Sequence, residues 1–322
     1  MHRIVICLLM AFGATIISSG HHARADLARI DNRIIQDQAG RQVTVAKPFQ
    51  RIVSLYGAHT ENLFALGADN QVIGVSRNEA YPPEALLKPV FSYHDDPEKF
   101  LAARPDLVLI RPMIDRGYPQ LVARLEASGI TVASLQPSSV DQMRTYWEIL
   151  GILCGRHQQA LAMINRFESA VAEFKSLASA IQPKKRVYFE AIHSKMKTFA
   201  PDSMAIFALQ TAGGINIATD AEPVRRTNIA AYGKERIMSH ADRIDVYLAQ
   251  LGEMNRPTVD IIRNEPGFSA IKAVRDNEIY LIDEMIVSRP TMRLLDGIQE
   301  IGSTLYPDVF ERSAANSTSS RP

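Results

Sequence analysis

The chain carries one short pattern twice, once in each half. A glutamate, Glu98 or Glu235, opens a helical turn of apolar residues, and after a polar break a strand-like run follows at residues 107–110 and 244–248. The apolar residues stand at matching offsets from the two glutamates. This repetition predicts two similar α/β lobes, each with a carboxylate at the start of a helix. Because clefts between domains are preferred ligand sites, we expect a ligand cleft between the lobes.

Strand-like and helical runs alternate along both halves. In the first half, strands are expected at residues 52–55, 72–75, 107–110 and 131–135, and helices at 60–66 and 119–127. The second half restarts the scheme with strands expected at 186–190 and, late in the chain, at 279–282. Such alternation predicts an α/β fold with mostly parallel sheets that are covered by helices.

A different kind of segment lies between the halves. Residues 156–181 contain neither Gly nor Pro, and their apolar positions recur every three or four residues, which is typical of a helix. At 1.5 Å per residue this helix would be about 40 Å long. We expect one long helix to bridge the two lobes and to allow only a small hinge motion between them.

The N-terminus is typical of a secretory signal. A basic start precedes an apolar run at residues 4–17, which is shorter than the roughly 20 residues of a transmembrane helix. The small-residue pattern at 23–25 predicts cleavage before Asp26 and a periplasmic protein. Cys7 lies inside this signal and does not follow a lipid-attachment pattern. Cys154 would then remain alone, so no internal disulfide is expected.

These boundaries divide the chain into five parts. We expect a signal peptide at 1–25, an N-terminal lobe at 26–155, the bridging helix at 156–182, a C-terminal lobe at 183–312 and a disordered tail at 313–322. The formal net charge of +1 argues against a nucleic-acid partner, which would favour a strongly basic face.

The sequence contains none of the common catalytic signatures. Neither a Gly-x-Ser-x-Gly elbow, nor His-Glu-x-x-His, nor a P-loop is present. His59 and Glu61 are two residues apart at a helix start, where their side chains would diverge rather than form a catalytic pair. We therefore expect no enzyme, no catalytic residues and no cofactor. A periplasmic enzyme and a ligand sensor remain as alternatives, because fold alone does not decide function.

Four stretches, at residues 50–68, 72–83, 97–108 and 271–283, follow one another in an order that is similar to a known family. The chain resembles the periplasmic substrate-binding proteins of ABC importers for iron-siderophores, haem and cobalamin, over nearly all of residues 40–308. The resemblance implies two α/β lobes bridged by one long helix. It also implies a monomer that binds a metal chelate in the cleft and delivers it to an ABC permease dimer with its ATPase subunits.

The resemblance also assigns a role to the repeated glutamates. In this family a surface glutamate on each lobe docks on arginines of the permease, and by motif position these are Glu98 and Glu235 here. Helix dipoles stabilise carboxylates at helix starts, and a carboxylate accepts paired hydrogen bonds from arginine. We expect both glutamates on one rim of the molecule, at the mouth of the cleft.

The candidate ligand-binding residues lie in loops that follow predicted strands. They are Tyr56, Arg77, Tyr93, His94, Arg111, His193, Arg225, Arg226, Tyr232, Arg289 and Arg293. Basic and aromatic residues prevail among them, which suits an anionic ligand because guanidinium groups bind carboxylates in paired geometry. The sequence therefore favours a ferric siderophore with carboxylate or catecholate groups.

Other ligands of this family remain alternatives. Tyr93, His94 or His193 would serve as an axial ligand of haem iron. Cobalamin would favour apolar aromatic residues, but the single tryptophan, Trp147, lies on a helix between the lobes. A bare metal ion would need several converging ligands, and the segment 94–96 reads equally well as a solvated turn, so no dedicated metal site is predicted.

Overall fold

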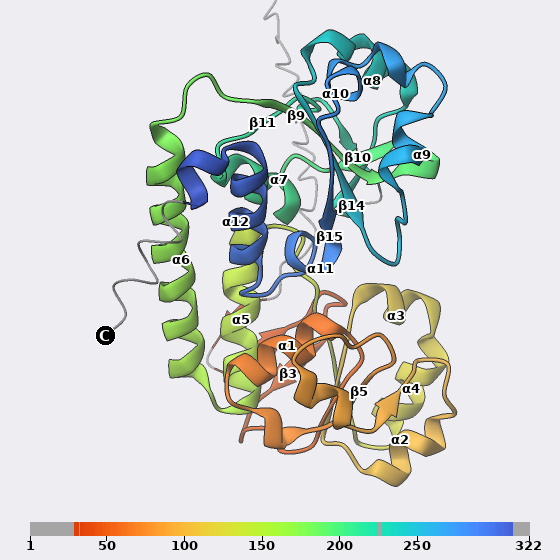
Figure 1. Cartoon of the computed structure of the whole chain (residues 1–322). Coiled ribbons are helices and arrows are strands. Elements are labelled where there is room, and N and C mark those ends of the chain that lie inside the picture. The colour runs from red at the N-terminus through yellow and green to blue at the C-terminus, as the bar shows by residue number, and fades with distance from the viewer. Residues whose placement is uncertain (1–28, 32, 225–226, 312–322) are drawn as a thin grey trace, which may run out of the picture.

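The structure is a computed structural model that describes residues 29–31, 33–224 and 227–311. Two lobes are joined by a long helix that runs along one side of the molecule (Figure 1). The expected signal segment and the expected disordered tail lie outside the described residues. Among the described residues, no helix is both long enough and apolar enough to cross a membrane.

The sheet of the N-terminal lobe is entirely parallel. Its five strands lie in the order β6-β5-β4-β7-β8, and the two central strands are fully buried, as is typical of parallel sheets. The strands are β4 (Ile52–Ser54), β5 (Val72–Ser76), β6 (Val90–Phe91), β7 (Leu107–Ile110) and β8 (Thr131–Ser134). The helices are α1 (Gly57–Ala65), α2 (Pro97–Ala103), α3 (Pro112–Gly117) and α4 (Pro119–Ala127).

A small antiparallel sheet precedes this lobe. It consists of β1 (Arg29–Asp31), β2 (Ile34–Gln36) and β3 (Gln42–Thr44). Arg41 ties it to the lobe, because its guanidinium binds Asp37 at 3.0 Å, Glu126 at 2.6 Å and also Asp115.

The sheet of the C-terminal lobe has a parallel part and an antiparallel part. The strands β9 (Arg186–Ile192), β14 (Val246–Leu251), β15 (Ile279–Asp283) and β11 (Ile215–Asn216) are parallel to one another. An antiparallel extension adds β10 (Lys197–Phe199), β13 (Ile229–Ala231) and β12 (Glu222–Pro223). The helices are α7 (Met204–Thr211), α8 (Lys234–Ser239), α9 (Val259–Arg263), α10 (Lys272–Arg275), α11 (Glu284–Val287) and α12 (Leu294–Leu305).

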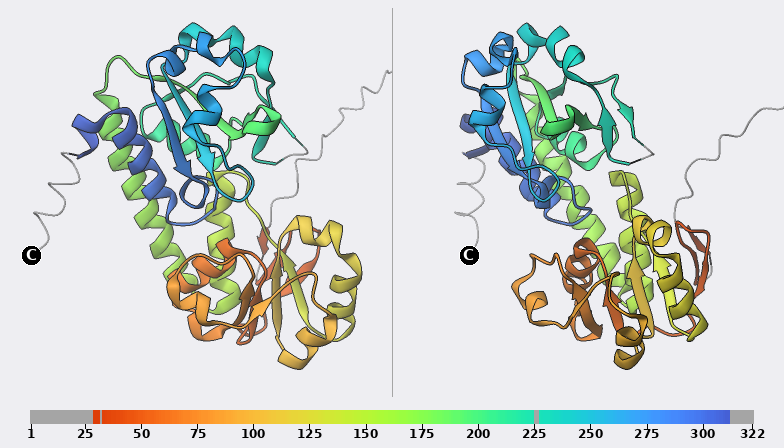
Figure 2. Two further views of the ribbon diagram at one scale, coloured as in Figure 1. Left: turned by 45° about the vertical axis from the view of Figure 1, so that its right-hand side comes forward. Right: turned by 90° about the vertical axis from the view of Figure 1, so that its right-hand side faces the viewer.

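The helix α5 (Val140–Cys154) leads into the long helix α6 (His157–Ser179), which connects the lobes. α5 ends at Gly155, whose φ of 72° is a left-handed conformation that glycine adopts without strain. α6 then runs for 23 residues, about 35 Å, and lies within the range 156–182 expected for the bridging helix. Figure 2 shows α6 passing along both lobes.

The largest hydrophobic cluster extends through this connection. It contains Ile52 of the first lobe, Trp147 of α5, Phe167 of α6 and Phe189 of the second lobe, all fully buried. Cys154 is buried in the same cluster. Because close-packed interiors transmit displacement, this continuous core opposes a wide rotation of one lobe against the other. The expected fold, two α/β lobes bridged by one long helix, is confirmed.

Candidate functional site

The carboxyl ends of the N-lobe strands carry the predicted ligand residues. Tyr56 follows β4, Arg77 follows β5, Tyr93 and His94 follow β6, and Arg111 follows β7. Because the strands are parallel, these residues lie along one edge of the sheet, which is the usual ligand edge of an α/β sheet. Asn78, next to Arg77, donates a hydrogen bond to Glu253 of the C-lobe at 3.0 Å, so this edge faces the other lobe.

A C-lobe segment, residues 289–293, reaches across to the N-lobe. The carbonyl of Pro290 accepts hydrogen bonds from Asn62 Nδ2 at 2.9 Å and from Trp147 Nε1 at 3.2 Å. The guanidinium carbon of Arg293 lies 4.7 Å from the centre of the Tyr81 ring, a cation–π contact. The structure thus brings two predicted residues, Arg289 and Arg293, to the N-lobe edge.

Arg289 occupies the space in front of Gly57 at the start of α1. A Cβ at Gly57 would overlap Nη1 of Arg289 and stand 3.1 Å from its Cζ, so the absence of a side chain at this position admits the guanidinium. Nη2 of Arg289 lies 3.5 Å from the carbonyl oxygen of Asn78. Nη1 is buried and donates to no acceptor in the part of the chain that the structure describes.

Two carboxylates of the N-lobe, Glu61 and Glu79, lie near this arginine. Glu61 and Glu79 of the N-lobe and Glu284 of the C-lobe each have a buried Oε2 that accepts no hydrogen bond from the described residues. Burial raises the pKa of Glu61 and of Glu79, and the positive charge of Arg289 acts in the opposite direction on both. Oε1 of Glu79 accepts hydrogen bonds from Ser76 Oγ at 2.6 Å and Thr60 Oγ1 at 3.1 Å, which fixes the carboxylate in place.

Aromatic side chains complete the N-lobe side of the site. The guanidinium carbon of Arg111 lies 5.0 Å from the centre of the Tyr56 ring. Tyr93, His94 and Tyr118 form a group whose ring centres are 4.5–5.0 Å apart. Tyr118 was not among the predicted residues, because it lies between two helices and not at a strand end.

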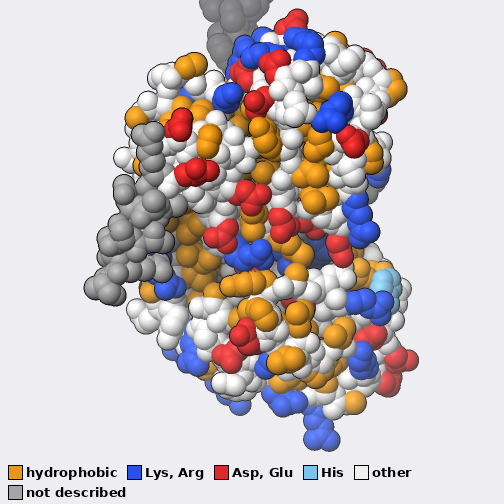
Figure 3. Space-filling view, viewed as in Figure 1, with side chains coloured by type: hydrophobic (Ala, Val, Ile, Leu, Met, Phe, Trp, Pro, Cys, Tyr) orange, Lys and Arg blue, Asp and Glu red, His pale blue; other side chains and the backbone are white. Residues whose placement is uncertain are grey.

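A cavity of about 530 Å³ opens at the carboxyl ends of β14 and β15 in the C-lobe. It is lined by Leu251, Gly252, Glu253, Arg256, Pro257, Thr258, Asp283, Glu284 and Met285. Figure 3 shows basic and acidic side chains side by side in the waist between the lobes. The cleft is therefore mixed in charge, whereas the predicted ligand residues alone are basic and aromatic. Its acidic members include Glu61 of α1, Glu79 of the loop after β5 and Glu284, the first residue of α11, none of which was among the predicted residues.

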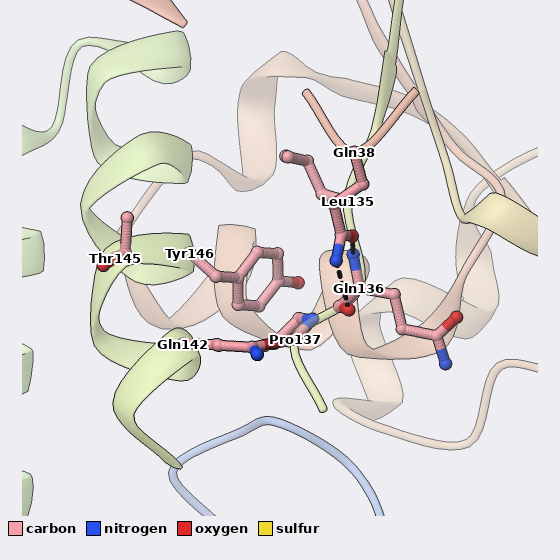
Figure 4. Close-up of a pocket in the computed structure, with 7 residues that line it drawn as sticks. All are labelled: Gln38, Leu135, Gln136, Pro137, Gln142, Thr145 and Tyr146. Atoms are coloured by element: carbon pink, nitrogen blue, oxygen red, sulfur yellow. Dashed lines mark hydrogen bonds between the residues drawn. The ribbon is translucent and has the colours of Figure 1, made fainter. Parts of the chain in front are cut away.

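A second cavity lies within the N-lobe, away from this site. It is lined by Gln38, Leu135, Gln136, Pro137, Gln142, Thr145 and Tyr146 (Figure 4), and its volume is only about 20 Å³. That volume holds about one water molecule and not a chelate. Figure 4 also shows the two glutamines Gln38 and Gln136 joined by hydrogen bonds that link the N-terminal hairpin to the lobe.

Two predicted ligand residues, His193 and Tyr232, have their described contacts inside the C-lobe and not in this cleft. His193 follows β9, but its side chain is 11% exposed and its Nδ1 lies 2.7 Å from Glu190 inside the C-lobe. Tyr232 is buried in the C-lobe core, where Arg236 stacks on its ring at 4.9 Å. Arg225 and Arg226 lie outside the described residues.

The paired glutamates occupy equivalent positions in the two lobes. Glu98 is the second residue of α2, and Glu235 is the second residue of α8. Both side chains are exposed; that of Glu98 is 65% exposed and lies 3.4 Å from Arg124. Figures 1 and 2 show α2 and α8 at opposite outer ends of the molecule. The expectation of a shared position at the mouth of the cleft is therefore wrong, since both sheets lie between the two helices.

His59 and Glu61 do not form a catalytic pair. His59 Nε2 donates to the carbonyl of Ile110 at 3.0 Å, and its Nδ1 accepts from the hydroxyl of Tyr146 at 2.7 Å. Burial lowers the pKa of His59 to about 4, so the ring is neutral and structural. The nearest cation to Glu61 Oε2 is Arg293 Nη1, at 3.8 Å. Within the described ranges, no three His, Cys, Asp or Glu side chains are grouped so as to hold a metal ion.

Comparison with known proteins gives one consistent answer. A sequence profile described as "Periplasmic binding protein" matches residues 52–285. The uncharacterized ABC transporter substrate-binding lipoprotein YvrC of Bacillus subtilis (strain 168) is 26% identical over 283 residues, which are 86% of each chain. A vitamin B12-binding protein of Vibrio cholerae is 23% identical and covers 80% of this chain and 90% of its own.

Solved structures of periplasmic binding proteins have a similar fold. The crystal structure of a possible iron-binding (periplasmic solute-binding) protein from Staphylococcus epidermidis superposes with a TM-score of 0.71 at 24% identity. It covers 81% of this chain and all of its own. The two-lobe fold, the single bridging helix and the profile match over most of the chain agree with the resemblance found in the sequence. The chain belongs to the periplasmic binding protein family, whose members are substrate-binding proteins of ABC transporters.

Proposed function

We propose that the protein captures a metal chelate between its lobes and delivers it to an ABC permease. The observation that carries this proposal is the crossing of segment 289–293 to the N-lobe edge, where Arg289 lies against Gly57. Groups from both lobes thereby face a common space. A ligand held there would contact both lobes at once, which is how a bridged two-lobe protein would couple binding to a change in lobe angle.

The preferred ligand is an anionic ferric siderophore. Its support is the set of guanidinium groups at the site, from Arg77, Arg111, Arg289 and Arg293, together with the buried Nη1 of Arg289 that has no acceptor among the described residues. A carboxylate or catecholate oxygen would supply that acceptor. The partial neutralisation by nearby glutamates limits the number of negative charges that such a ligand can carry.

A corrinoid is the second candidate. The buried Oε2 atoms of Glu61, Glu79 and Glu284 accept no hydrogen bond from the described residues, and amide N–H groups would satisfy them. Several relatives of similar identity are named as vitamin B12-binding or cobalamin-binding proteins. Haem is a weaker alternative, for which Tyr93 or His94 would be the axial ligand.

The test uses Trp147, the single tryptophan of the chain. It is fully buried at the lobe junction, and coloured iron chelates and corrinoids quench tryptophan emission. The mature protein would be titrated with a ferric catecholate, a ferric hydroxamate, haemin and cyanocobalamin. The proposal expects the ferric catecholate to bind most tightly. Tightest binding of cyanocobalamin would select the second candidate, and no binding of any of the four would refute the chelate proposal.

A matched pair of variants tests the role of the arginines. Arg111→Met should weaken binding about ten- to a hundredfold, because a charge-assisted contact contributes roughly 1.5–3 kcal/mol. Arg116→Met is the control, since Arg116 lies in α3, the helix that follows Arg111, and its exposed side chain makes no hydrogen bond within the described chain. Equal affinity of both variants and the wild type would remove Arg111 from the site.

The proposed location is the periplasm, reached by a cleavable signal. N-terminal sequencing of the protein from a periplasmic fraction should find Asp26 as the first residue. A chain that retains Met1, or one that carries a lipid on Cys7, would contradict this location.

A further inference from the structure

A buried polar network in the C-lobe joins the cavity loop to the helix that bears Glu235. Its centre is Glu190, a fully buried carboxylate in strand β9. Glu190 accepts hydrogen bonds from His193 Nδ1 at 2.7 Å, from Asn255 Nδ2 at 3.2 Å and from the hydroxyl of Tyr247. Asn255 also accepts from the backbone N–H of His193 at 2.9 Å. It belongs to the loop that lines the C-lobe cavity, so the loop and strand β9 are held together at this point.

His193 extends this network outward to α8. Its Nε2 is buried, forms no hydrogen bond with the described residues and lies 3.7 Å from Glu265 Oε2. Oε1 of Glu265 accepts from Lys234 Nζ at 2.6 Å. Lys234 is the first residue of α8 and directly precedes Glu235.

The backbone around His193 holds the same helix start. The carbonyl of His193 accepts from Met196 N at 2.9 Å, and the carbonyl of Met196 accepts from Gly233 N at 3.0 Å. Gly233, with φ of 92°, is the residue before α8 and adopts the left-handed conformation that favours glycine. The turn that contains His193 therefore holds the first residues of α8 through side-chain contacts (His193 to Glu265 to Lys234) and through backbone hydrogen bonds (His193 to Met196 to Gly233).

The charges in this network explain what His193 contributes. A buried carboxylate is costly unless it is paired, and Glu190 and Glu265 approach His193 from strand β9 and from the loop after α9. Lys234 of α8 faces the same group of side chains, and Tyr247 and Asn255 offer only neutral donors. An imidazolium at position 193 donates to Glu190 through Nδ1 and faces Glu265 through Nε2, so it balances two acidic groups at once.

We propose that protonated His193 is a positioning residue that fixes the start of α8, and with it the orientation of Glu235, relative to the cavity loop. That this positioning serves permease docking rests on the proposed function, whereas the positioning of α8 by His193 does not. The hydrogen bond to Glu190 raises the pKa of His193 above its ordinary value. A raised pKa in the folded state means that the stabilisation is complete below about pH 6.5, and is lost as the pH rises through the folded-state pKa.

Hydrogen–deuterium exchange of the mature protein tests the proposal without a ligand or a permease. The readout is the protection of the α8 amides, corrected for the intrinsic effect of pH on exchange. In the wild type, this protection should fall between about pH 6 and about pH 9, as His193 loses its proton. In His193→Gln it should be low and independent of pH. Wild-type protection without pH dependence, or full protection in His193→Gln, would overturn the proposal.

Two further variants make the result specific. His157→Gln is the matched control, because His157 also faces a carboxylate, Glu148 at 2.9 Å, but is 42% exposed and lies on α6; its α8 protection should equal that of the wild type. Glu265→Gln removes only the outer carboxylate, and should lower α8 protection while the amides of β9 stay protected. Loss of protection in α8 and β9 together would show general destabilisation and would contradict a local positioning role.

The docking role is separated by a third variant, Glu235→Ala. It should leave the pH dependence of α8 protection intact, because the Glu235 side chain takes no part in the network. Normal α8 protection with normal transport in this variant would refute the docking role and leave the positioning role standing. Loss of the α8 response in His193→Gln with weakened transport would support both.

Discussion

Replacement of Gly57 by alanine should act on the structure through Arg289. The added Cβ would overlap Nη1 of Arg289 and stand 3.1 Å from its Cζ and 3.3 Å from its Nη2. Ordinary contacts between such atoms are about 3.5–4.0 Å, so the guanidinium must move by about 1 Å or more. The displaced side chain would lose its contact with the Asn78 carbonyl and its approach to Glu61 and Glu79.

Two opposing terms set the expected magnitude. A hydrogen bond that involves a charged group contributes roughly 1.5–3 kcal/mol, which is the most that the displacement of Arg289 can cost. Gly57 is a helical residue of α1 without a positive φ, so alanine there gains up to about 1 kcal/mol of helix propensity. Gly57→Ala should therefore lower the free energy of unfolding by about 0.5–2 kcal/mol in the wild-type background.

The sign of this effect should reverse when Arg289 is absent. In an Arg289→Ala background the steric conflict no longer exists, and Gly57→Ala should be neutral or stabilising by up to about 1 kcal/mol. The double-mutant cycle should thus yield a coupling energy of about 1.5–3 kcal/mol. Urea unfolding followed by the emission of Trp147 measures each free energy, because this single tryptophan is fully buried between the lobes.

A matched control exists in the same lobe. A Cβ at Gly117, the last residue of α3, would meet no atom within 4 Å, so Gly117→Ala should not depend on Arg289. The reasoning is refuted if Gly57→Ala costs the same free energy with and without Arg289, since the loss would then not arise from the guanidinium.

Three further outcomes are expected. Glu98→Ala and Glu235→Ala should leave ligand affinity and the unfolding midpoint nearly unchanged while transport by the reconstituted importer falls, most in the double variant; normal transport by the double variant would exclude a docking role. Small-angle scattering should detect a lobe closure of only a few degrees on ligand binding, because α6 and the shared core resist hinge motion, and a wide closure would contradict this. Burial would raise the pKa of Asp245, but hydrogen bonds from Arg186 at 3.0 Å and Lys272 at 2.7 Å hold it well below its ordinary value. The stabilisation from these bonds is present above about pH 4 and is lost as the pH falls, so the stability of Asp245→Asn should depend less steeply on acid pH than that of the wild type. Parallel acid-unfolding curves of the two proteins would refute the assignment.

The bounds of several helices and strands with a clear local sequence pattern were predicted accurately from the sequence. The strand at 107–110 and the helix at 119–127 have the expected bounds, and α6 begins one residue after its predicted start and ends three residues before its predicted end. These segments combine a regular apolar period with clear end signals, so local propensity and burial agree. The antiparallel extension of the C-lobe sheet was not predicted, because its strands are only two or three residues long and carry no readable period.

The predicted ligand residues also divide into those whose position follows from local pattern and those whose position depends on tertiary contacts. Tyr56 and Arg111 were found at the N-lobe edge because the ends of parallel strands must share one edge, which the sequence pattern implies. His193 also follows a strand, but its ring turns to Glu190. That choice depends on a buried carboxylate in need of a partner, and residue order alone does not reveal it.

Sequence by itself determined two α/β lobes, one bridging helix and a glutamate at the same helical position in each lobe. Tertiary structure alone decided which groups share the cleft. Gly57 and Arg289 are more than 200 positions apart in the chain, and they meet because segment 289–293 crosses to the N-lobe through hydrogen bonds to the Pro290 carbonyl. Periodicity reports the burial of a residue within its own element, whereas contacts between lobes depend on how already folded elements pack, and packing is set by shape and by the pairing of buried polar groups.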